Sequence, residues 1–274
     1  DMEKKHGSVI AASLRQRRRE SGARYGLFVT LPGGVGELVT VLARRVADQG
    51  VRIELGARVV DIQRGPTGFR IQMADRDAID ADAIIVAIPA WRAGPLLERL
   101  SPALAARLGR IPYASTAVVV SGHRLEDIEH PLDAFGLVVP HCEHRSVLAV
   151  SFASRKFDGR APEGRVLLRT FVGGALQPEL YDLADEAIER LVRRELADML
   201  GVRGEPDFMR VVRHPRSMPQ YELGHVALVD AVEAELTRLP RLALAGNAYR
   251  GVGIPDCIQS GENAALRVMT DLLR

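Results

Sequence analysis

The segment with the clearest capacity for chemistry lies near the C-terminus, between Leu244 and Ala265. It contains Gly251 and Gly253 in a short loop, and Pro255 follows where a helix can begin without losing a hydrogen bond. Glycines let the backbone approach a ligand closely, and a helix N-terminus offers free N–H groups with partial positive charge. This combination suits an anion or an electron-rich heteroaromatic ring. On these residues alone, a plain turn between a strand and a helix is the favoured interpretation.

No other group of polar residues predicts a reactive centre. The seven histidines form no Ser–His–Asp, Cys–His or metal-ligand pattern, and Cys142 and Cys257 give neither metal-binding spacing nor a disulfide framework. We therefore expect no catalytic side chain and no metal ligand. Such a pattern is typical of proteins in which a bound cofactor carries the chemistry.

The elements flanking the loop would position it. A buried strand is expected over Leu242–Leu244, followed by a turn through Gly246 and Asn247. A helix is expected from Pro255, because apolar residues recur at helical spacing on one face: Ile258, Ala265, Val268 and Leu272.

The residues up to position 100 predict an amphipathic helix over Glu37–Gln49, several short strands, and a helix over Ala90–Leu100 that leaves the domain. Alternating and β-rich segments place these strands at 28–32, 51–55, 58–64, 68–73 and 83–88. The glycines of GGVGEL (33–38) resemble a dinucleotide fingerprint only superficially, since no βαβ unit with an acidic residue about 20 positions further on follows them.

Between residues 101 and 224 the pattern changes. A helix is expected over Ala103–Gly109 and a long helix over Leu183–Met199. The β segments are expected at 116–120, 135–139, 147–152, 166–172 and 208–212. This pattern predicts a separate domain of antiparallel strands and a helix, inserted into an α/β domain at crossings near residues 100 and 225.

The composition limits the class of protein and the partners that can be expected. The chain has 274 residues, 47% of them apolar and 26% charged, as in an ordinary globular protein with one large or two modest domains. The net charge of +2 argues against nucleic acid as a main partner. The sequence has no apolar run of the roughly 18 residues that a membrane span needs.

The segment AGNAYRGVGIPDCIQSGENAA resembles the C-terminal flavin-binding segment of protoporphyrinogen oxidases, within the flavin amine-oxidase superfamily. Four further passages are similar to that family: DAFGLVVP (133–140), SFASRKFDGRAPEG (151–164), LLRTFVGG (167–174) and MPQYELGH (218–225). The last discriminates best against monoamine oxidases, polyamine oxidases and carotene desaturases.

The resemblance implies FAD as cofactor and a partial FAD-binding two-dinucleotide-domain fold, of class α/β (α+β), with an inserted antiparallel-sheet-plus-helix substrate domain. Residues 26–100 and 225–274 would form the FAD-binding domain, and residues 1–25 and 101–224 the substrate-binding domain. The implied cofactor contacts are Val59 at the adenine, and Gly246, Asn247, Gly251, Val252, Gly253 and Ile254 near the ring. A Cβ at Gly253 is expected either to clash with the ring or to force a costly φ. The implied tetrapyrrole contacts are Phe135, Gly136 and Val138.

The activity implied is oxidation of protoporphyrinogen IX to protoporphyrin IX in haem biosynthesis, by hydride transfer to the flavin, with molecular oxygen as acceptor and hydrogen peroxide as product. The family starts with a strand, a GxGxxG loop and a helix that this sequence lacks, so we expect a fragment that does not hold FAD by itself. The resemblance also implies a cytoplasmic protein, and it allows peripheral contact with the cytoplasmic membrane and a homodimer.

Two alternatives remain at this point. The substrate that the flavin oxidises could be coproporphyrinogen III, with Arg169, Arg216 and Arg250 as candidate partners for its additional propionates. It could also be an amine, for which Tyr249 is the one aromatic residue in the ring-side loop. The chain could also be a non-catalytic module of a larger enzyme.

Overall fold

The computed structural model describes residues 29–274, which form two compact units. The expected assignment of residues 1–25 to the substrate-binding domain falls on residues outside the described part of the chain. The smaller unit contains residues up to Ile53 together with Lys156–Gly159, and its helix α3 (Gly36–Asp48) confirms the amphipathic helix expected there.

Two expected strands do not form. Residues 29–32 and 51–55 are irregular or turn segments in the described chain, so the strand predictions for 28–32 and 51–55 are wrong over these residues. A β-strand is held by hydrogen bonds to a neighbouring strand. Sequence pattern alone does not supply that neighbour.

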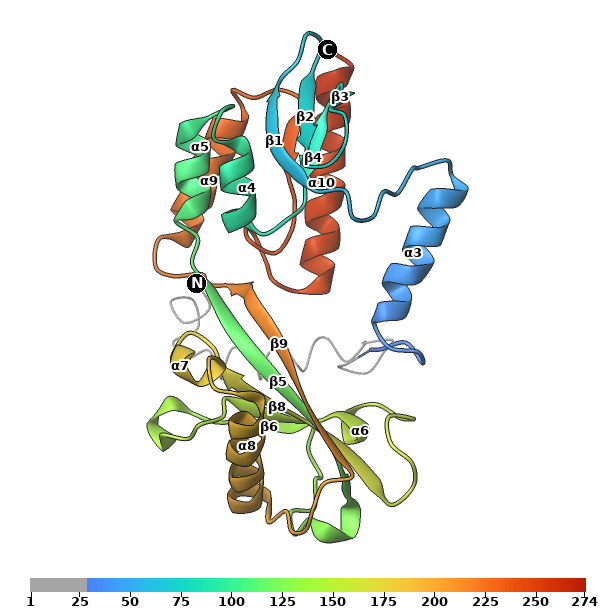
Figure 1. The fold of residues 1–274 in the computed structure, drawn as a ribbon, viewed down its shortest axis with the longest axis vertical. Helices are drawn as coiled ribbons and strands as arrows, with labels where there is room; N and C mark the ends of the chain where they lie inside the picture. The colour runs from blue at the N-terminus through green and yellow to red at the C-terminus, as the bar shows by residue number, and fades with distance from the viewer. Residues whose placement is uncertain (1–28) are drawn as a thin grey trace, which may run out of the picture. The chain divides into compact units, whose positions relative to one another are not determined.

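In the larger unit, a pair of parallel strands separates two hydrophobic cores. Strand β10 (Leu242–Leu244) pairs with β4 (Ile84–Val86) along its whole length. Side chains alternate between the two faces of a strand. Leu242 accordingly packs into a core with helix α9, whereas Ala243 and Ala245 pack against helix α10 (Ile254–Leu272). Helix α10, drawn in red in Figure 1, begins one residue before the expected Pro255.

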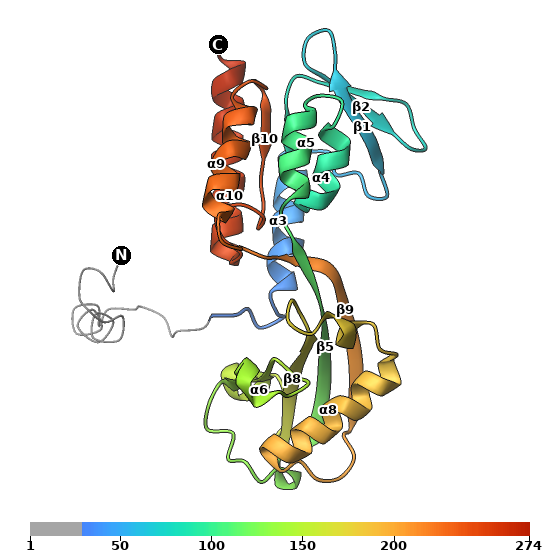
Figure 2. The ribbon, with the colours of Figure 1, turned by 90° about the vertical axis from the view of Figure 1, so that its left-hand side faces the viewer.

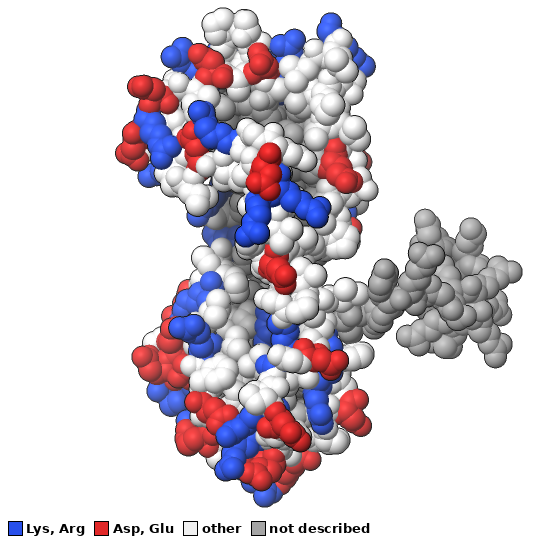
Figure 3. All heavy atoms as spheres, turned by 90° about the vertical axis from the view of Figure 1, so that its right-hand side faces the viewer, with Lys and Arg blue, Asp and Glu red and all other residues white. Residues whose placement is uncertain are grey.

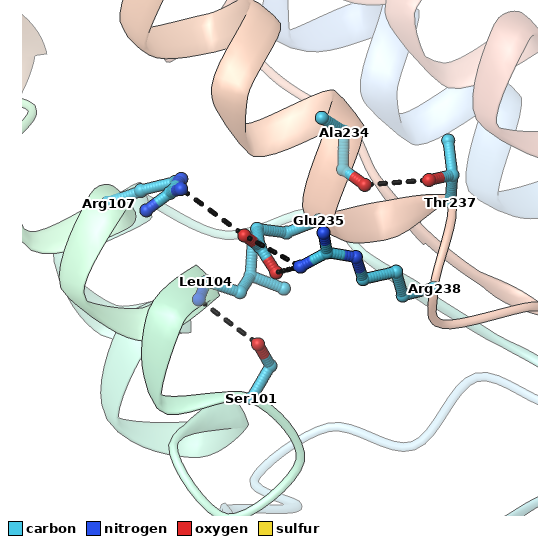
Figure 4. Close-up of polar contacts among 7 residues, drawn as sticks. All are labelled: Ser101, Leu104, Arg107, Ala234, Glu235, Thr237 and Arg238. Carbon is cyan, nitrogen blue, oxygen red and sulfur yellow. Dashed lines mark hydrogen bonds and ion pairs between the residues drawn. The ribbon is translucent and has the colours of Figure 1, made fainter.

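Three helices share the core on the Leu242 side: α4 (Ala90–Leu97), α5 (Pro102–Gly109) and α9 (His225–Leu236). The expected helix 103–109 therefore forms, but its Leu104 and Leu108 pack with this core and not with the inserted sheet. A polar contact joins two of these helices, because the carboxylate of Glu235 in α9 pairs with Arg107 of α5 at 3.2 Å (Figure 4). The same carboxylate pairs with Arg238, just after α9, at 3.3 Å.

A small antiparallel meander lies next to this core. Its strands are β1 (Val59–Arg64), β2 (Phe69–Met73) and β3 (Ile79–Ala81), paired in that order. Ile62 and Phe69 are buried and join the core. Strand β3 was not expected from sequence.

The inserted domain is a five-stranded sheet in the order β6-β7-β8-β5-β9, in which every neighbouring pair is antiparallel. The strands are β5 (Tyr113–Arg124), β6 (Gly136–Val138), β7 (Ala149–Phe152), β8 (Arg165–Gly173) and β9 (Phe208–Pro219). Short helices α6 (Ala153–Lys156) and α7 (Pro178–Tyr181) lie in its connections.

Helix α8 (Asp185–Leu200) covers one face of the sheet (Figure 2). Its buried side chains recur every fourth residue, at Ile188, Val192, Leu196 and Leu200, and pack against the buried residues of β5 and β8. On the opposite, open face of the sheet, Val138, Phe208 and Val212 are exposed.

Candidate functional site

The glycine-rich loop begins where the two parallel strands end. The Ala245 N–H donates to the Val86 carbonyl at 3.1 Å, and Gly246 follows with a φ of +122° that favours glycine. The Gly246 N–H donates in turn to Ser260 Oγ of α10 at 3.1 Å. Ligands of parallel α/β sheets bind outside the carboxyl ends of the strands. Gly246 and Asn247, both expected cofactor contacts, lie at that edge.

Asp256 fixes the next segment of the loop. Its Oδ2 accepts the Gly253 N–H at 3.1 Å, which satisfies one of the free amides at the start of α10. Gly253 has a φ of −71°, which any residue can adopt. A Cβ at Gly253 would therefore cause no backbone strain, and the expected penalty from a costly φ is wrong. Gly251 is more restricted, because a Cβ there would lie 2.4 Å from Asp256 Cγ. Val252 and Ile254 are half exposed, so this loop offers aliphatic side chains as well as backbone to a ligand.

The expected adenine contact Val59 borders an apolar hollow of about 710 Å³. The wall of this hollow comes from β1, β2, β4 and α4 and includes Ile62, Ile71, Ile85, Ile88, Trp91 and Leu96. Apolar walls with room for a flat ring are typical of nucleotide and cofactor sites. Val59 also packs against the same core as Ile84 and Leu244 of the two parallel strands.

The three expected substrate contacts lie together on the inserted sheet. Gly136 and Val138 point to its open face, since Leu137 between them packs into the α8 core, and Phe135 directly precedes β6. Gly136 has a φ of +148°, and a Cβ there would lie 2.4 Å from the Val150 carbonyl oxygen. The glycine therefore has a structural reason at this position, independent of any ligand.

A row of paired residues crosses the open face from Gly136. Its members are Gly136, Ser151, Arg169, Val120 and Arg210, one from each of the five strands. Neighbouring strands lie about 4.8 Å apart, so the two arginines are two strand spacings, roughly 10 Å, from each other along the row. Arg210 was not expected at the site. The alternation of β9, in which Met209 and Val211 pack toward α8, is the sequence signal that would have placed it.

The other two arginines considered for propionates are engaged elsewhere. Arg250 pairs with Asp230 at 2.7 Å and Glu233 at 2.8 Å, and hydrogen bonds to Glu233 and then to Asp230 raise the pKa of its guanidinium. The guanidinium of Arg216 lies 4.0 Å from the centroid of the Trp91 ring, and Trp91 Nε1 donates to the Arg216 carbonyl at 3.1 Å. Arg169 is exposed on the open sheet face.

The aromatic residue of the loop faces inward. Tyr249 is 7% exposed and belongs to the core around α9, where burial raises the pKa of its hydroxyl. It therefore offers no aromatic wall to a ligand at the loop. Tyr221 and His225, which were not expected at the site, contact the loop backbone instead. Both residues belong to the MPQYELGH passage, which the sequence analysis had singled out without assigning them a role.

On the face drawn in Figure 3, basic and acidic side chains are interspersed. None of the helices in the described residues is both long and apolar enough to cross a membrane. The described residues also contain no cluster of three or more His, Cys, Asp or Glu side chains suited to a metal ion.

Known proteins are similar to this chain in sequence and architecture. Over 266 residues the chain is 29% identical to a coproporphyrinogen III oxidase of Staphylococcus aureus, covering 94% of this chain and 55% of that protein. It is 32% identical to human protoporphyrinogen oxidase over 271 residues, covering 94% of this chain and 54% of that protein. A candidate protoporphyrinogen oxidase of Exiguobacterium sp. 255-15 superposes with a TM-score of 0.81 at 27% identity, over 99% of this chain and 57% of that one.

These relatives confirm the expected mixed α/β fold and the resemblance to porphyrinogen oxidases. The chain spans about half the length of the curated relatives it matches. The family profile described as flavin containing amine oxidoreductase matches residues 2–269. The chain therefore belongs to the family of flavin-containing amine oxidoreductases.

Proposed function

We propose that the whole protein oxidises protoporphyrinogen IX to protoporphyrin IX with FAD. The open sheet face is the observation that supports this substrate. The exposed Phe135 and Val138 lie there near Gly136, and Arg169 and Arg210 belong to the same row as Gly136. Exposed apolar side chains suit a flat hydrophobic macrocycle, and guanidinium groups suit carboxylates. Two arginines match the two propionates of protoporphyrinogen.

The residues of the described chain fit a portion of an FAD site. The backbone of Gly246, Asn247 and Gly251–Ile254 would face the pyrimidine edge of the ring, and the apolar hollow at Val59 would take the adenine. Bound FAD would supply the hydride acceptor, with molecular oxygen then reoxidising it to give hydrogen peroxide. The N-terminus of α10 would favour negative charge at the pyrimidine edge. Asp256 lowers that preference, because its carboxylate lies at the same helix end.

The test is turnover of the full-length protein with FAD and protoporphyrinogen IX in air. Porphyrin fluorescence should grow well above the autoxidation blank, and hydrogen peroxide should accumulate with it. Arg169→Ala and Arg210→Ala should each raise KM more than they lower kcat, since they would bind the substrate periphery and not the reacting carbon. Growth of fluorescence no faster than the blank would reject the proposal.

Coproporphyrinogen III is the second candidate substrate. The relatives named coproporphyrinogen III oxidase favour it, and its four propionates would require cations beyond Arg169 and Arg210. Turnover of the two porphyrinogens side by side, at matched concentrations, decides between them through the ratio of kcat/KM values. An amine substrate is disfavoured by the inward position of Tyr249.

A further proposal concerns the 274-residue chain alone, namely that it does not hold FAD by itself. The hollow beside Val59 supports this, because it is open and would enclose a bound adenine only in part. Isothermal titration with FAD tests it, and micromolar affinity of the isolated chain would contradict it.

The resemblance alone supports three further proposals: a cytoplasmic location, peripheral contact with the cytoplasmic membrane, and a homodimer. Flotation with lipid vesicles and sedimentation analysis of the full-length protein test the last two.

A further inference from the structure

Two aromatic side chains from the segment between β9 and α9 lie against the glycine-rich loop. The rings of Tyr221 and His225 are stacked, with centroids 3.8 Å apart and an angle of 12° between their planes. His225 is buried at the first residue of α9, whereas Tyr221 is 41% exposed. The buried imidazole thus provides a fixed platform for the tyrosine ring.

The hydroxyl of Tyr221 joins the two ends of the turn. It donates a hydrogen bond to the Asn247 carbonyl at 2.7 Å and accepts one from the Gly251 N–H at 3.0 Å. Burial raises the pKa of this phenol, so the hydroxyl keeps the proton that it donates. One side-chain oxygen therefore fixes the separation of Asn247 from Gly251.

His225 holds the middle of the same turn. Its Nε2 lies 2.9 Å from the Tyr249 carbonyl oxygen. Since a carbonyl oxygen only accepts, Nε2 carries a proton and donates. The stacked pair consequently bonds to the backbone at residues 247, 249 and 251, while Ser260 and Asp256 bond to Gly246 and Gly253 on either side.

We propose that Tyr221 is a positioning residue for the cofactor loop: its hydroxyl holds residues 247–251 in the conformation that presents Gly251–Ile254 to the flavin. This inference rests on the proposed flavin function. A loop ordered before binding loses less conformational entropy when the ligand arrives. Loss of the hydroxyl should therefore weaken ligand binding through the loop, although Tyr221 itself acts only through the backbone that it holds.

Tyr221→Phe tests this in two measurements, because phenylalanine keeps the stacked ring and removes only the hydroxyl. The first is amide hydrogen exchange of the protein without FAD, where peptides covering 247–254 should exchange about 5–10-fold faster and peptides from α8 should be unchanged. The second is FAD titration of the full-length protein, where Kd should rise about 5–10-fold. Tyr181→Phe, in α7 against the α8 core, is the matched control and should change neither.

Unchanged exchange at 247–254 in Tyr221→Phe would overturn the proposal. A second variant, His225→Phe, keeps an aromatic platform and removes only the bond to the Tyr249 carbonyl, so it should also accelerate exchange across 249–251. Unchanged exchange across 249–251 in His225→Phe would count equally against the proposal that the stacked pair of Tyr221 and His225 orders the loop. If the wild-type full-length protein fails to bind FAD, the proposed function falls, while the exchange experiment still decides whether Tyr221 orders the loop.

Discussion

Replacing Gly136 with alanine should destabilise the inserted sheet strongly. The residue has a φ of +148°, a region that residues with a Cβ rarely adopt, at a cost of about 1–3 kcal/mol. The new Cβ would also lie 2.4 Å from the Val150 carbonyl oxygen and 3.0 Å from Ser151 Cα. Both atoms belong to the backbone of β7, which has no flexible side-chain end to move aside. Overpacking of this kind costs about 1–3 kcal/mol more.

The two costs together predict a loss of about 2–6 kcal/mol in the free energy of unfolding. For a chain of this size, about 1 kcal/mol corresponds to a shift of roughly 2–4 °C, so Tm should fall by about 4–24 °C. Thermal melts followed by circular dichroism measure this. Gly109→Ala is the control, since a Cβ at that helical position would meet no atom within 4 Å. A melting temperature for Gly136→Ala within about 1 °C of this control would refute the reasoning from backbone geometry.

Three further changes test the described contacts. Glu235→Gln should lower stability by about 1–2 kcal/mol in denaturant titrations, less than for a fully buried pair because Arg107 is one-third exposed; no loss would show that the pair is energetically silent. Tyr249→Phe should leave Tm unchanged or raise it slightly, because the buried hydroxyl lacks a partner among the described residues, and a clear fall would contradict this. Burial lowers the pKa of His123, so the unfolded chain binds the extra proton first as pH falls below about 6.5, and stability should decline there. Denaturant titrations at pH 7.5 and 5.5 (roughly one unit either side of that value) should show a smaller decline for His123→Gln, and an equal decline would exclude His123 as its source.

Much of the local structure was predictable because it depends on the pattern of nearby residues. The alternation of Leu242 and Ala243 between two helical layers, and the four-residue spacing of Ile188 and Val192 in α8, follow directly from the periodicities of strand and helix. The glycine-rich loop and its following helix were also placed correctly, with the helix starting at Ile254.

Pairing between distant segments was not predictable in the same way. Strand β9 was expected over 208–212 but extends to Pro219, because β5 offers pairing partners from Tyr113 to Gly122. Residues 51–55 have a strand-like sequence yet remain irregular. In both cases the deciding factor is a neighbour far away in the chain, which local propensity does not contain.

The candidate site also combines features that sequence predicts with features that depend on the tertiary structure. The sequence by itself supplied the candidate contacts for a flavin and a tetrapyrrole, through glycines, aliphatic residues and their resemblance to a family. Only the tertiary structure decided that Arg169 and Arg210 share a row with Gly136, that Tyr249 faces inward, and that Tyr221 holds the loop. Those relations depend on strand register and on hydrogen bonds between residues about 26 to 30 positions apart, which form only when the chain has folded.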